Sequence, residues 1–148
     1  MQARKWNVKK DYPLILKWCN QRGWDLPIPQ ETLPAVGVMV TEQEDICAAG
    51  LFVDKTSKLG FMWGIFSNPK IGKIKLFKAM KMCVEEIKKQ ASKNKISLVY
   101  TITGESALHK LYEKHICMTM CENNINSYVM NLNKKKYKNL DWISQYVK

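Results

Sequence analysis

Three apolar runs, separated by short polar segments, lie in the first half of the chain. They cover residues 36–41, 46–54 and 59–67, and each break between them is four residues long. Short runs rich in β-branched and aromatic residues are typical of strands, and short polar breaks favour antiparallel hairpins. We therefore expect three consecutive antiparallel strands. The third is almost continuously apolar, which predicts that both of its faces are covered.

Residues 74–91 carry apolar side chains at every third or fourth position. These positions are Ile74, Phe77, Met80, Val84, Ile87 and Ala91. Only a helix places such positions on one face, so the pattern predicts a long amphipathic helix. Charged residues fall mostly elsewhere on the helix and predict a solvated flank: Lys75, Lys78, Lys81, Glu85, Lys88 and Lys89.

Weaker patterns suggest the remaining elements. Asp11 is expected to cap a helix that has Pro13 in its first turn and ends at Gly23, and Ser106 is expected to cap a helix over 107–115. Short strands are expected at 5–9, 96–103, 116–120 and 125–132, a helical turn at 30–33, and a docked helix in the tail around Leu140, Trp142, Ile143, Tyr146 and Val147.

Length and charge bound the class of protein. The 148 residues suffice for one globular domain over 1–148, with a basic tail at 133–148. Lys and Arg number 24 against 13 Asp and Glu, a net charge of +11. A field of this sign attracts nucleotides, CoA-like cofactors, nucleic acid or anionic surfaces. The alternative is that the lysines only keep a small protein in solution.

The cysteines favour a reducing compartment. There are five, without a CxxC pair, and Cys47 and Cys83 lie within apolar stretches, as expected for reduced thiols of a cytoplasmic protein. His115, Cys117 and Cys121 lack the paired spacing of structural zinc sites, so no metal is expected. No apolar leader and no run of 18 apolar residues is present, so neither a signal peptide nor a membrane span is expected.

Gly72 lies between the apolar strand at 59–67 and the long helix. The first backbone N–H groups of a helix are unpaired, and the helix dipole makes that end positive, so a strand–turn–helix of this kind can bind anions. The alternative is a glycine chosen for turn geometry beside a solvated, lysine-rich helix start.

The order of elements resembles the GNAT superfamily of acyl-CoA N-acyltransferases over nearly the whole chain, and within it small proteins encoded by bacteriophages. The resemblance rests on Trp18, Gly23-Trp24, Leu33-Pro34, Val36-Gly37, Ala48-Ala49-Gly50, Thr56, Ser67-Asn68-Pro69 and the string from Leu111 to His115. It implies a mixed α/β fold of the α+β type, with a mostly antiparallel sheet of about seven strands and helices on both faces.

The resemblance also implies a site for acetyl-CoA or another acyl-CoA. In the superfamily the strand matching 60–67 splays from its neighbour and pairs with the pantetheine arm, and the following turn holds the pyrophosphate. The usual turn has Arg or Gln, two residues, Gly, one residue, and Gly or Ala, of which the window 69–74 keeps only Gly72. The implied cofactor residues are Ile65, Phe66, Ser67, Lys70, Ile71, Gly72, Lys73, Ile74 and Lys75, with the three lysines compensating as point charges.

Tyr112 matches a tyrosine that in many GNAT enzymes protonates the departing CoA thiolate. A phenol with a pKa of about 10 suits a thiolate of about 8.5. The alternative is an aromatic that only packs with its helix neighbours. Related bacteriophage proteins carry Glu where this chain has Trp63, so no base is assigned, although Glu105 and His109 are expected near the site.

Two functions follow from these features. The first is an acyl-CoA-dependent N-acyltransferase, acetyl in the first instance, whose acceptor amine is unidentified and whose positive surface favours anionic or nucleotide-like acceptors. The second is an inactive binding module for nucleic acid or a host protein, which uses basic residues and exposed aromatics. The aromatics considered for it are Trp6, Trp24, Tyr137 and Trp142. The chain is expected to be a monomer, or a homodimer formed through the apolar tail.

Overall fold

The computed structural model describes residues 1–24, 29–54, 56–103, 108–109, 111–116, 118–122 and 127–131. From residue 119 onward only the backbone is described. In chain order the elements are β1 (Gln2–Lys5), α1 (Val8–Gln21), the 3-10 turn η1 (Gln30–Thr32), β2 (Val36–Glu42), β3 (Glu44–Val53), β4 (Leu59–Ser67), α2 (Lys73–Lys93), β5 (Leu98–Ile102), the π-helical η2 (Leu111–His115), β6 (Thr119–Glu122) and β7 (Ser127–Asn131).

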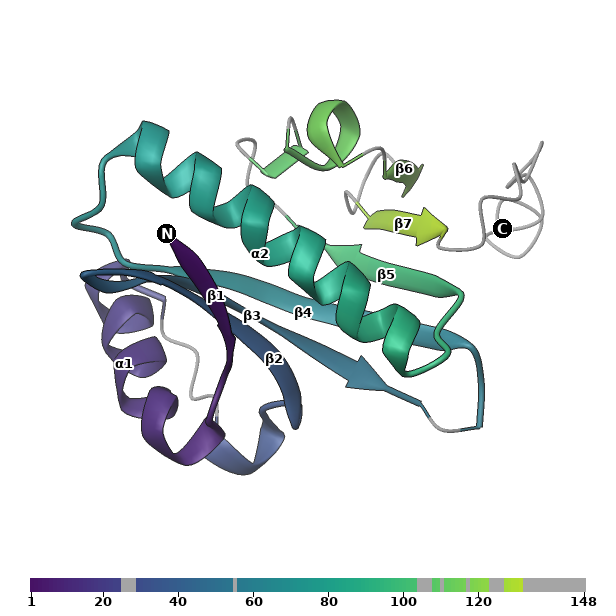
Figure 1. Ribbon diagram of the computed structural model, residues 1–148, viewed down its shortest axis with the longest axis horizontal. Helices are drawn as coiled ribbons and strands as arrows, with labels where there is room; N and C mark the ends of the chain where they lie inside the picture. The colour runs from purple at the N-terminus through teal and green to yellow at the C-terminus, as the bar shows by residue number, and fades with distance from the viewer. Residues whose placement is uncertain are drawn as a thin grey trace.

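The strands form one seven-stranded sheet in the order β1-β2-β3-β4-β5-β7-β6. Every neighbouring pair is antiparallel except β4 and β5, which are parallel. Helix α1 packs on one face and α2 on the other (Figure 1). The expected mixed, mostly antiparallel sheet with helices on both faces is therefore confirmed.

The main core lies between the sheet and α2. Alternate strand residues such as Val38, Leu51 and Met62 point at α2, which buries Val84 and Ile87 against them. The predicted helix at 74–91 is confirmed, with two more residues at its C-terminal end and one at its start. Ile74 departs from the predicted apolar face, because it lies in the first turn, before the helix meets the sheet, and is 77% exposed.

The opposite face carries a second core around Trp6. This side chain was expected to be exposed, and that expectation is wrong: it is 3% exposed, and its Nε1–H donates to the Pro34 carbonyl at 3.1 Å. A Cβ added at Gly37 would lie 2.0 Å from the Trp6 ring, and one at Gly50 would lie 2.6 Å from it. The two glycines therefore make room for the indole on the sheet.

The N-terminal elements differ from the expected ones. Residues 5–9 do not form a strand, because β1 ends at Lys5 and α1 begins at Val8. The cap of α1 is Asn7, whose side-chain oxygen accepts from the Lys10 N–H at 3.1 Å. Asp11 is not the cap; it lies buried within the helix, where it accepts hydrogen bonds from Arg4.

The elements after α2 are shorter than expected. Strand β5 occupies 98–102 of the expected 96–103, and β7 occupies 127–131 of the expected 125–132. The strand expected at 116–120 is present but begins later, as β6 at Thr119–Glu122, because Ile116 lies in a bend and packs into the core. The expected cap Ser106 and the tail at 133–148, with Tyr137 and Trp142, lie outside the described residues.

Three described cysteines, Cys19, Cys47 and Cys83, are buried free thiols. A hydrogen bond with Cys47, together with burial, raises the pKa of Cys83 well above its ordinary value. Within the described ranges, no helix combines the length and apolar character needed to cross a bilayer.

Candidate functional site

Strands β4 and β5 pair over three residues and then part. The parallel pairs join Leu59 to Leu98, Gly60 to Val99 and Phe61 to Tyr100. The Thr101 hydroxyl donates to the Met62 carbonyl at 2.9 Å and so links the two strands one residue further along. Strand β4 continues to Ser67 alongside β3 alone among the described strands. Beyond Phe61, its edge toward β5 therefore has no partner among the described strands, and it can offer backbone groups to a ligand.

Gly64 forms a bulge at the start of this gap. Ala49 pairs with Ile65 and Gly50 with Trp63, so Gly64 is an extra residue on β4. Its φ of +59° lies in the left-handed region that favours glycine. Bulges bend a strand and increase its twist, which here accompanies the separation of β4 from β5.

The side chains at the end of β4 are turned into the protein. Ile65 is 5% exposed and packs toward α2, whereas Phe66 packs into the core below α1. The Ser67 hydroxyl accepts from Arg22 Nη2 at 2.7 Å. These three residues were predicted to bind the cofactor. Their side chains face the protein, so what they offer at the open edge is their backbone groups.

Asn68 shapes the turn that follows β4. Its N–H donates to the Ile46 carbonyl at 2.9 Å, and its side-chain oxygen accepts from the Lys70 N–H at 3.0 Å. Its side-chain nitrogen donates to Glu44 at 3.2 Å, and the Ile71 N–H donates to its carbonyl. Since Asn68 holds the turn, the turn makes no special conformational demand on Gly72.

Gly72 is the N-cap of α2, with φ −60° and ψ 144° and no side-chain cap. The Leu76 N–H donates to its carbonyl, which begins the helix and leaves the N–H groups of residues 73–75 in the unpaired first turn. A Cβ at Gly72 would meet no heavy atom within 4 Å. Neither backbone conformation nor packing requires glycine here, whereas a ligand lying on the helix start would.

The charges around this helix start are mostly positive. The first turn contains Lys73 and Lys75 and no acidic residue, although cations are unfavourable at the positive end of a helix. Lys75 was predicted to act as a point charge toward the phosphates. In the structure its Nζ instead pairs with Glu42 of β2 at 2.8 Å. The hydrogen bond from Lys75 and a second from the N-terminal amine lower the pKa of Glu42 to about 2. Lys70 and Lys73 are exposed and have no salt bridge with any described residue.

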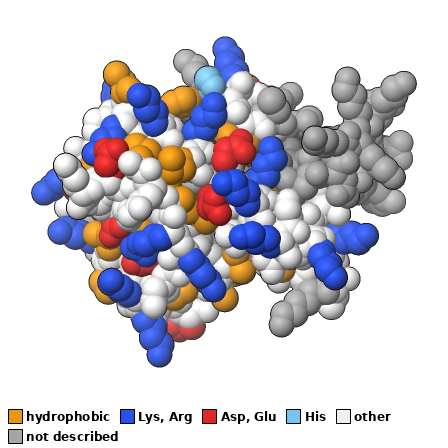
Figure 2. Space-filling view, viewed as in Figure 1, with side chains coloured by type: hydrophobic (Ala, Val, Ile, Leu, Met, Phe, Trp, Pro, Cys, Tyr) orange, Lys and Arg blue, Asp and Glu red, His pale blue; other side chains and the backbone are white. Residues whose placement is uncertain are grey.

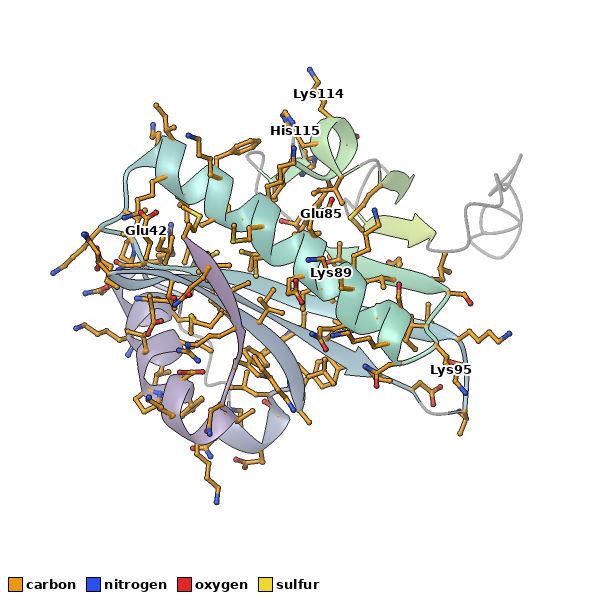
Figure 3. All side chains as sticks on the ribbon, viewed as in Figure 1. Glu42, Glu85, Lys89, Lys95, Lys114 and His115 are labelled. Carbon is orange, nitrogen blue, oxygen red and sulfur yellow. The ribbon has the colours of Figure 1, made fainter. Side chains whose placement is uncertain are left out.

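Figure 3 shows Glu42 beside the N-terminal half of α2. Figure 2 shows that on this face of the molecule Lys and Arg side chains are spread widely, with acidic side chains among them. The positive charge at the helix start is therefore a local feature of its first turn, within a broadly basic face.

Arg22 was not singled out from the sequence. It is the C-cap of α1, and its guanidinium lies 5.7 Å from the Trp24 ring while it binds Ser67. No described carboxylate pairs with it. It thus places a cation at the far end of the open β4 edge, from a residue 45 positions away in the sequence.

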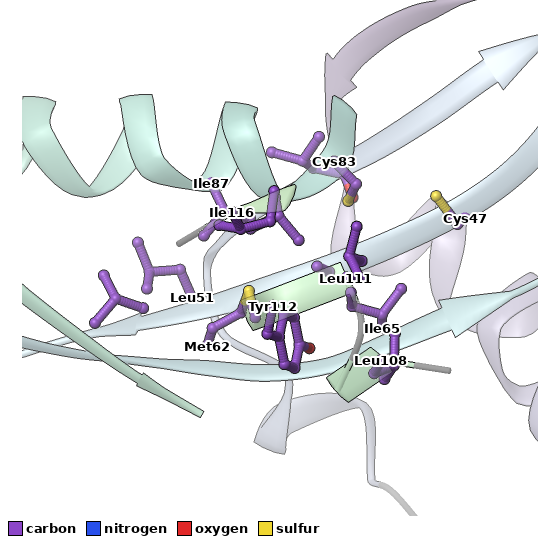
Figure 4. Packing of buried hydrophobic residues seen from close by; sticks show 14 of the residues in the cluster. Cys47, Leu51, Met62, Ile65, Cys83, Ile87, Leu108, Leu111, Tyr112 and Ile116 are labelled. Carbon is purple, nitrogen blue, oxygen red and sulfur yellow. The ribbon is translucent and has the colours of Figure 1, made fainter. Parts of the chain in front are cut away.

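Tyr112 lies in η2, on the side of the sheet that carries α2. It is 1% exposed and packs in the same core cluster as Met62, Ile65 and Leu111 (Figure 4). The Met118 N–H donates to its backbone carbonyl at 2.9 Å. The predicted packing with Leu111 is therefore present, and the phenol also lies next to the two β4 residues that border the gap.

The other candidate residues are only partly placed. His109 is half-buried, whereas Glu105 and Cys117 lie outside the described residues. His115 packs edge-on against Phe77, with ring centroids 5.0 Å apart. In the described part of the chain no three His, Cys, Asp or Glu side chains gather as metal ligands would.

The described surface contains two hollows that bear on the site. One of about 610 Å³ lies between the β3–β4 connection and the C-terminal end of α2, and Phe52, Lys58 and Lys95 are among its lining residues. Figure 3 shows Lys95 at the opposite end of α2 from Glu42. The other, of about 350 Å³, lies between α1 and the turn, where Lys70 and Asn68 line it. The larger hollow thus includes none of the predicted cofactor residues.

Comparison with known proteins identifies the fold. No protein-family model and no curated protein sequence matches the chain. Solved structures do match. Aminoglycoside 6'-acetyltransferase type Ii has a TM-score of 0.67 at 12% identity, with 89% of this chain and 97% of that chain covered. A GNAT-family acetyltransferase from Staphylococcus aureus has a TM-score of 0.63 at 12% identity, with 88% and 98% covered.

A Mycobacterium tuberculosis protein solved in complex with CoA has a TM-score of 0.64 at 13% identity, with 83% of this chain and 74% of that chain covered. At such identities the likeness shows the fold alone. The chain therefore has the fold of GNAT acyl-CoA N-acyltransferases, as its order of elements predicted.

Proposed function

We propose that this protein is an acyl-CoA-dependent N-acyltransferase that transfers an acyl group, acetyl in the first instance, to a primary amine. The observation that carries the proposal is the open edge of β4 leading to the uncapped start of α2. The fold shared with acetyltransferases, and with a protein solved in complex with CoA, supports it.

Acyl-CoA is proposed to lie along this edge. Amide groups of its pantetheine arm would pair with the backbone of residues 65–67, and its diphosphate would lie on the N–H groups of residues 73–75. Gly72 leaves the space that such an approach requires. Of the three lysines predicted to bind the phosphates, Lys70 and Lys73 have no salt bridge with a described residue, and we assign these two to the phosphates.

Arg22 is proposed to replace part of the usual cofactor motif. The window 69–74 has no leading Arg or Gln, but the Arg22 guanidinium reaches the end of β4 from α1. Its hydrogen bond to the Ser67 hydroxyl fixes Ser67, which is the last residue of β4. An arginine from another element can thus supply the positive charge and planar hydrogen-bond donors that the turn lacks.

Each part of the proposed reaction can be assigned to the cofactor or to residues of the chain. Bound acyl-CoA supplies a thioester and a thiol leaving group. The Tyr112 hydroxyl is proposed to donate a proton to the leaving sulfur, because a phenol is a suitable acid for a thiolate. Strand β4 contains no Asp or Glu and has Trp63 at its centre, so no carboxylate of β4 serves as base. The remaining rate enhancement comes from holding the neutral amine against the thioester.

The alternative is a non-enzymatic module that binds nucleic acid or a host protein through its basic surface. The net charge of +11 favours it, as do Lys70 and Lys73, which have no salt bridge with a described residue. The burial of Trp6 removes one of the aromatics on which this alternative depended. The bacteriophage resemblance, a cytoplasmic location and a single domain over 1–148 stay predictions; the buried free thiols agree with a reducing compartment.

Calorimetric titration of the full chain with acetyl-CoA tests the proposal. We expect a dissociation constant in the micromolar range that weakens as salt increases, since phosphate contacts are electrostatic. Lys73→Gln should weaken binding several-fold, and Lys93→Gln, at the opposite end of the same helix, should not. No binding at millimolar acetyl-CoA, together with salt-dependent DNA binding, would favour the alternative.

A further inference from the structure

Four aromatic side chains line the sheet face that does not carry α2, and we call them the aromatic floor: Phe52, Phe61, Trp63 and Tyr100. They come from β3, β4 and β5, the strands on either side of the gap. Phe52 is 40% exposed and the other three are half-buried. The floor thus lies beside the point where β4 and β5 part.

The two faces of the same strands differ sharply. Leu51, Met62 and Val99 point toward α2 and are at most 1% exposed. Their neighbours on the other face stay accessible, and Ile102, two residues along β5 from Tyr100, is 47% exposed. Helix α1 packs over Met39, Ala48 and Phe66, at the other end of these strands, and no described helix packs on the floor itself. An apolar surface left open in this way usually marks a binding site.

The rings of the floor hold one another in place. Phe61 lies 6.3 Å from Phe52 and 6.0 Å from Tyr100, with planes inclined by 25° and 31°. Trp63 meets Phe52 edge-on at 6.1 Å, and Phe66 at 5.3 Å. Because the rings are packed before any ligand arrives, a ligand that stacks on them loses little ordering entropy of the protein.

The gap is approachable from the floor side. On the α2 side, Leu111 and Tyr112 of η2 and Ile116 pack into one core with Met62 and close it (Figure 4). Trp63 on β4 and Tyr100 on β5 flank the gap from the opposite face. An amine that reaches a thioester in the gap would therefore pass over the floor.

We propose that the acceptor is a small primary amine carried on a planar aromatic ring, which stacks on the aromatic floor while the amine enters the gap. This rests on the proposed transferase function and adds the class of acceptor to it. The floor is continuous with the gap and made of rings, which stack on flat groups in offset or edge-on arrangements. The net charge of +11 disfavours a polycationic acceptor on the same surface.

A matched pair of amines tests the inference: 2-phenylethylamine and 2-cyclohexylethylamine differ only in the planarity and π-system of the ring. Thiol release by the full chain at saturating acetyl-CoA should show kcat/KM about tenfold higher for the aromatic amine, the size expected of one good stacking contact. Trp63→Leu, which keeps an apolar side chain without a ring, should reduce this ratio to about one. Ile102→Thr, on the same face without loss of a ring, should leave the ratio unchanged. Should Trp63→Leu fail to fold, Tyr100→Leu on the other strand replaces it.

The outcomes separate the two proposals. Equal kcat/KM for the two amines in the unmodified chain, or an aromatic preference that survives Trp63→Leu, would overturn the aromatic acceptor. If acetyl-CoA binds in calorimetry but neither amine is acetylated, the acceptor class fails while the cofactor site stands. If acetyl-CoA does not bind at all, both proposals fail. A dimer that dissociates on Trp63→Leu would instead assign the floor to a second copy of the chain.

Discussion

Substituting Asp for Gly72 should stabilise the protein and weaken its cofactor binding at the same time. Gly72 has the extended backbone of an N-cap but no side chain with which to cap α2. A Cβ there meets nothing within 4 Å, so Asp fits without a clash. Its carboxylate would accept from the unpaired N–H groups of residues 73–75 and lie beside Lys73.

The expected changes in stability and in acetyl-CoA affinity have opposite signs. Capping and the helix dipole together should add about 0.5–1 kcal/mol to the free energy of unfolding, which for a domain of this size raises Tm by about 1–4 °C. A carboxylate about 5 Å from a phosphate charge at an effective dielectric constant of about 20 costs about 3 kcal/mol before screening. We therefore expect the affinity for acetyl-CoA to fall at least about tenfold, which corresponds to about 1.4 kcal/mol.

Thermal unfolding and calorimetric titration of the same samples measure both effects. Gly72→Asn is the matched control, because Asn caps nearly as well as Asp without the charge. It should raise Tm similarly and weaken binding less. A Gly72→Asp variant that is more stable yet binds acetyl-CoA as tightly as the unmodified chain would refute a diphosphate site on this helix start.

Three further predictions concern single side chains. Tyr112→Phe should lower kcat by about 10²-fold or more and leave acetyl-CoA affinity unchanged, since general acid catalysis typically contributes that much; equal kcat in stopped-flow thiol release would remove Tyr112 from the mechanism. Glu42→Gln should release Lys75 and tighten acetyl-CoA binding by about threefold at low salt, an effect that about 0.5 M salt should abolish. Burial tends to raise the pKa of Asp11, but hydrogen bonds from Arg4 and the Asn7 N–H outweigh it and lower that pKa. The stability that Asp11 contributes is therefore complete above its unfolded pKa of about 3.9 and lost as the pH falls below it. Asp11→Asn should lower the free energy of unfolding by about 2 kcal/mol at pH 7, which is less than for a fully buried pair because the Arg4 side chain is 35% exposed. The variant should also lose less stability on acidification, as measured by circular dichroism.

The regular elements were readable from the sequence because their patterns are local. The apolar spacing after Ile74 predicted α2 to within two residues at either end. The N-terminus was misread because Asn7 and Asp11 are both good caps and lie one helical turn apart. What decides between them is the Arg4 guanidinium on β1, a contact across seven residues that no local pattern contains.

The candidate site was predictable only in part for the same reason. Gly72 and its lysines mark a helix start after a strand, and the structure confirms that position. The bulge at Gly64 depends on the register between β3 and β4, and the contact between Arg22 and Ser67 joins residues 45 positions apart. A glycine beside Trp63, inside an otherwise apolar strand, was the one available signal for the bulge.

The most direct test of the central claim is to follow backbone amide resonances of the ¹⁵N-labelled full chain during titration with CoA. If the open edge of β4 and the start of α2 bind the cofactor, the largest shifts will fall on residues 65–67 and 72–75. Shifts confined to the hollow near Phe52 and Lys95, or none at millimolar CoA, would contradict the account.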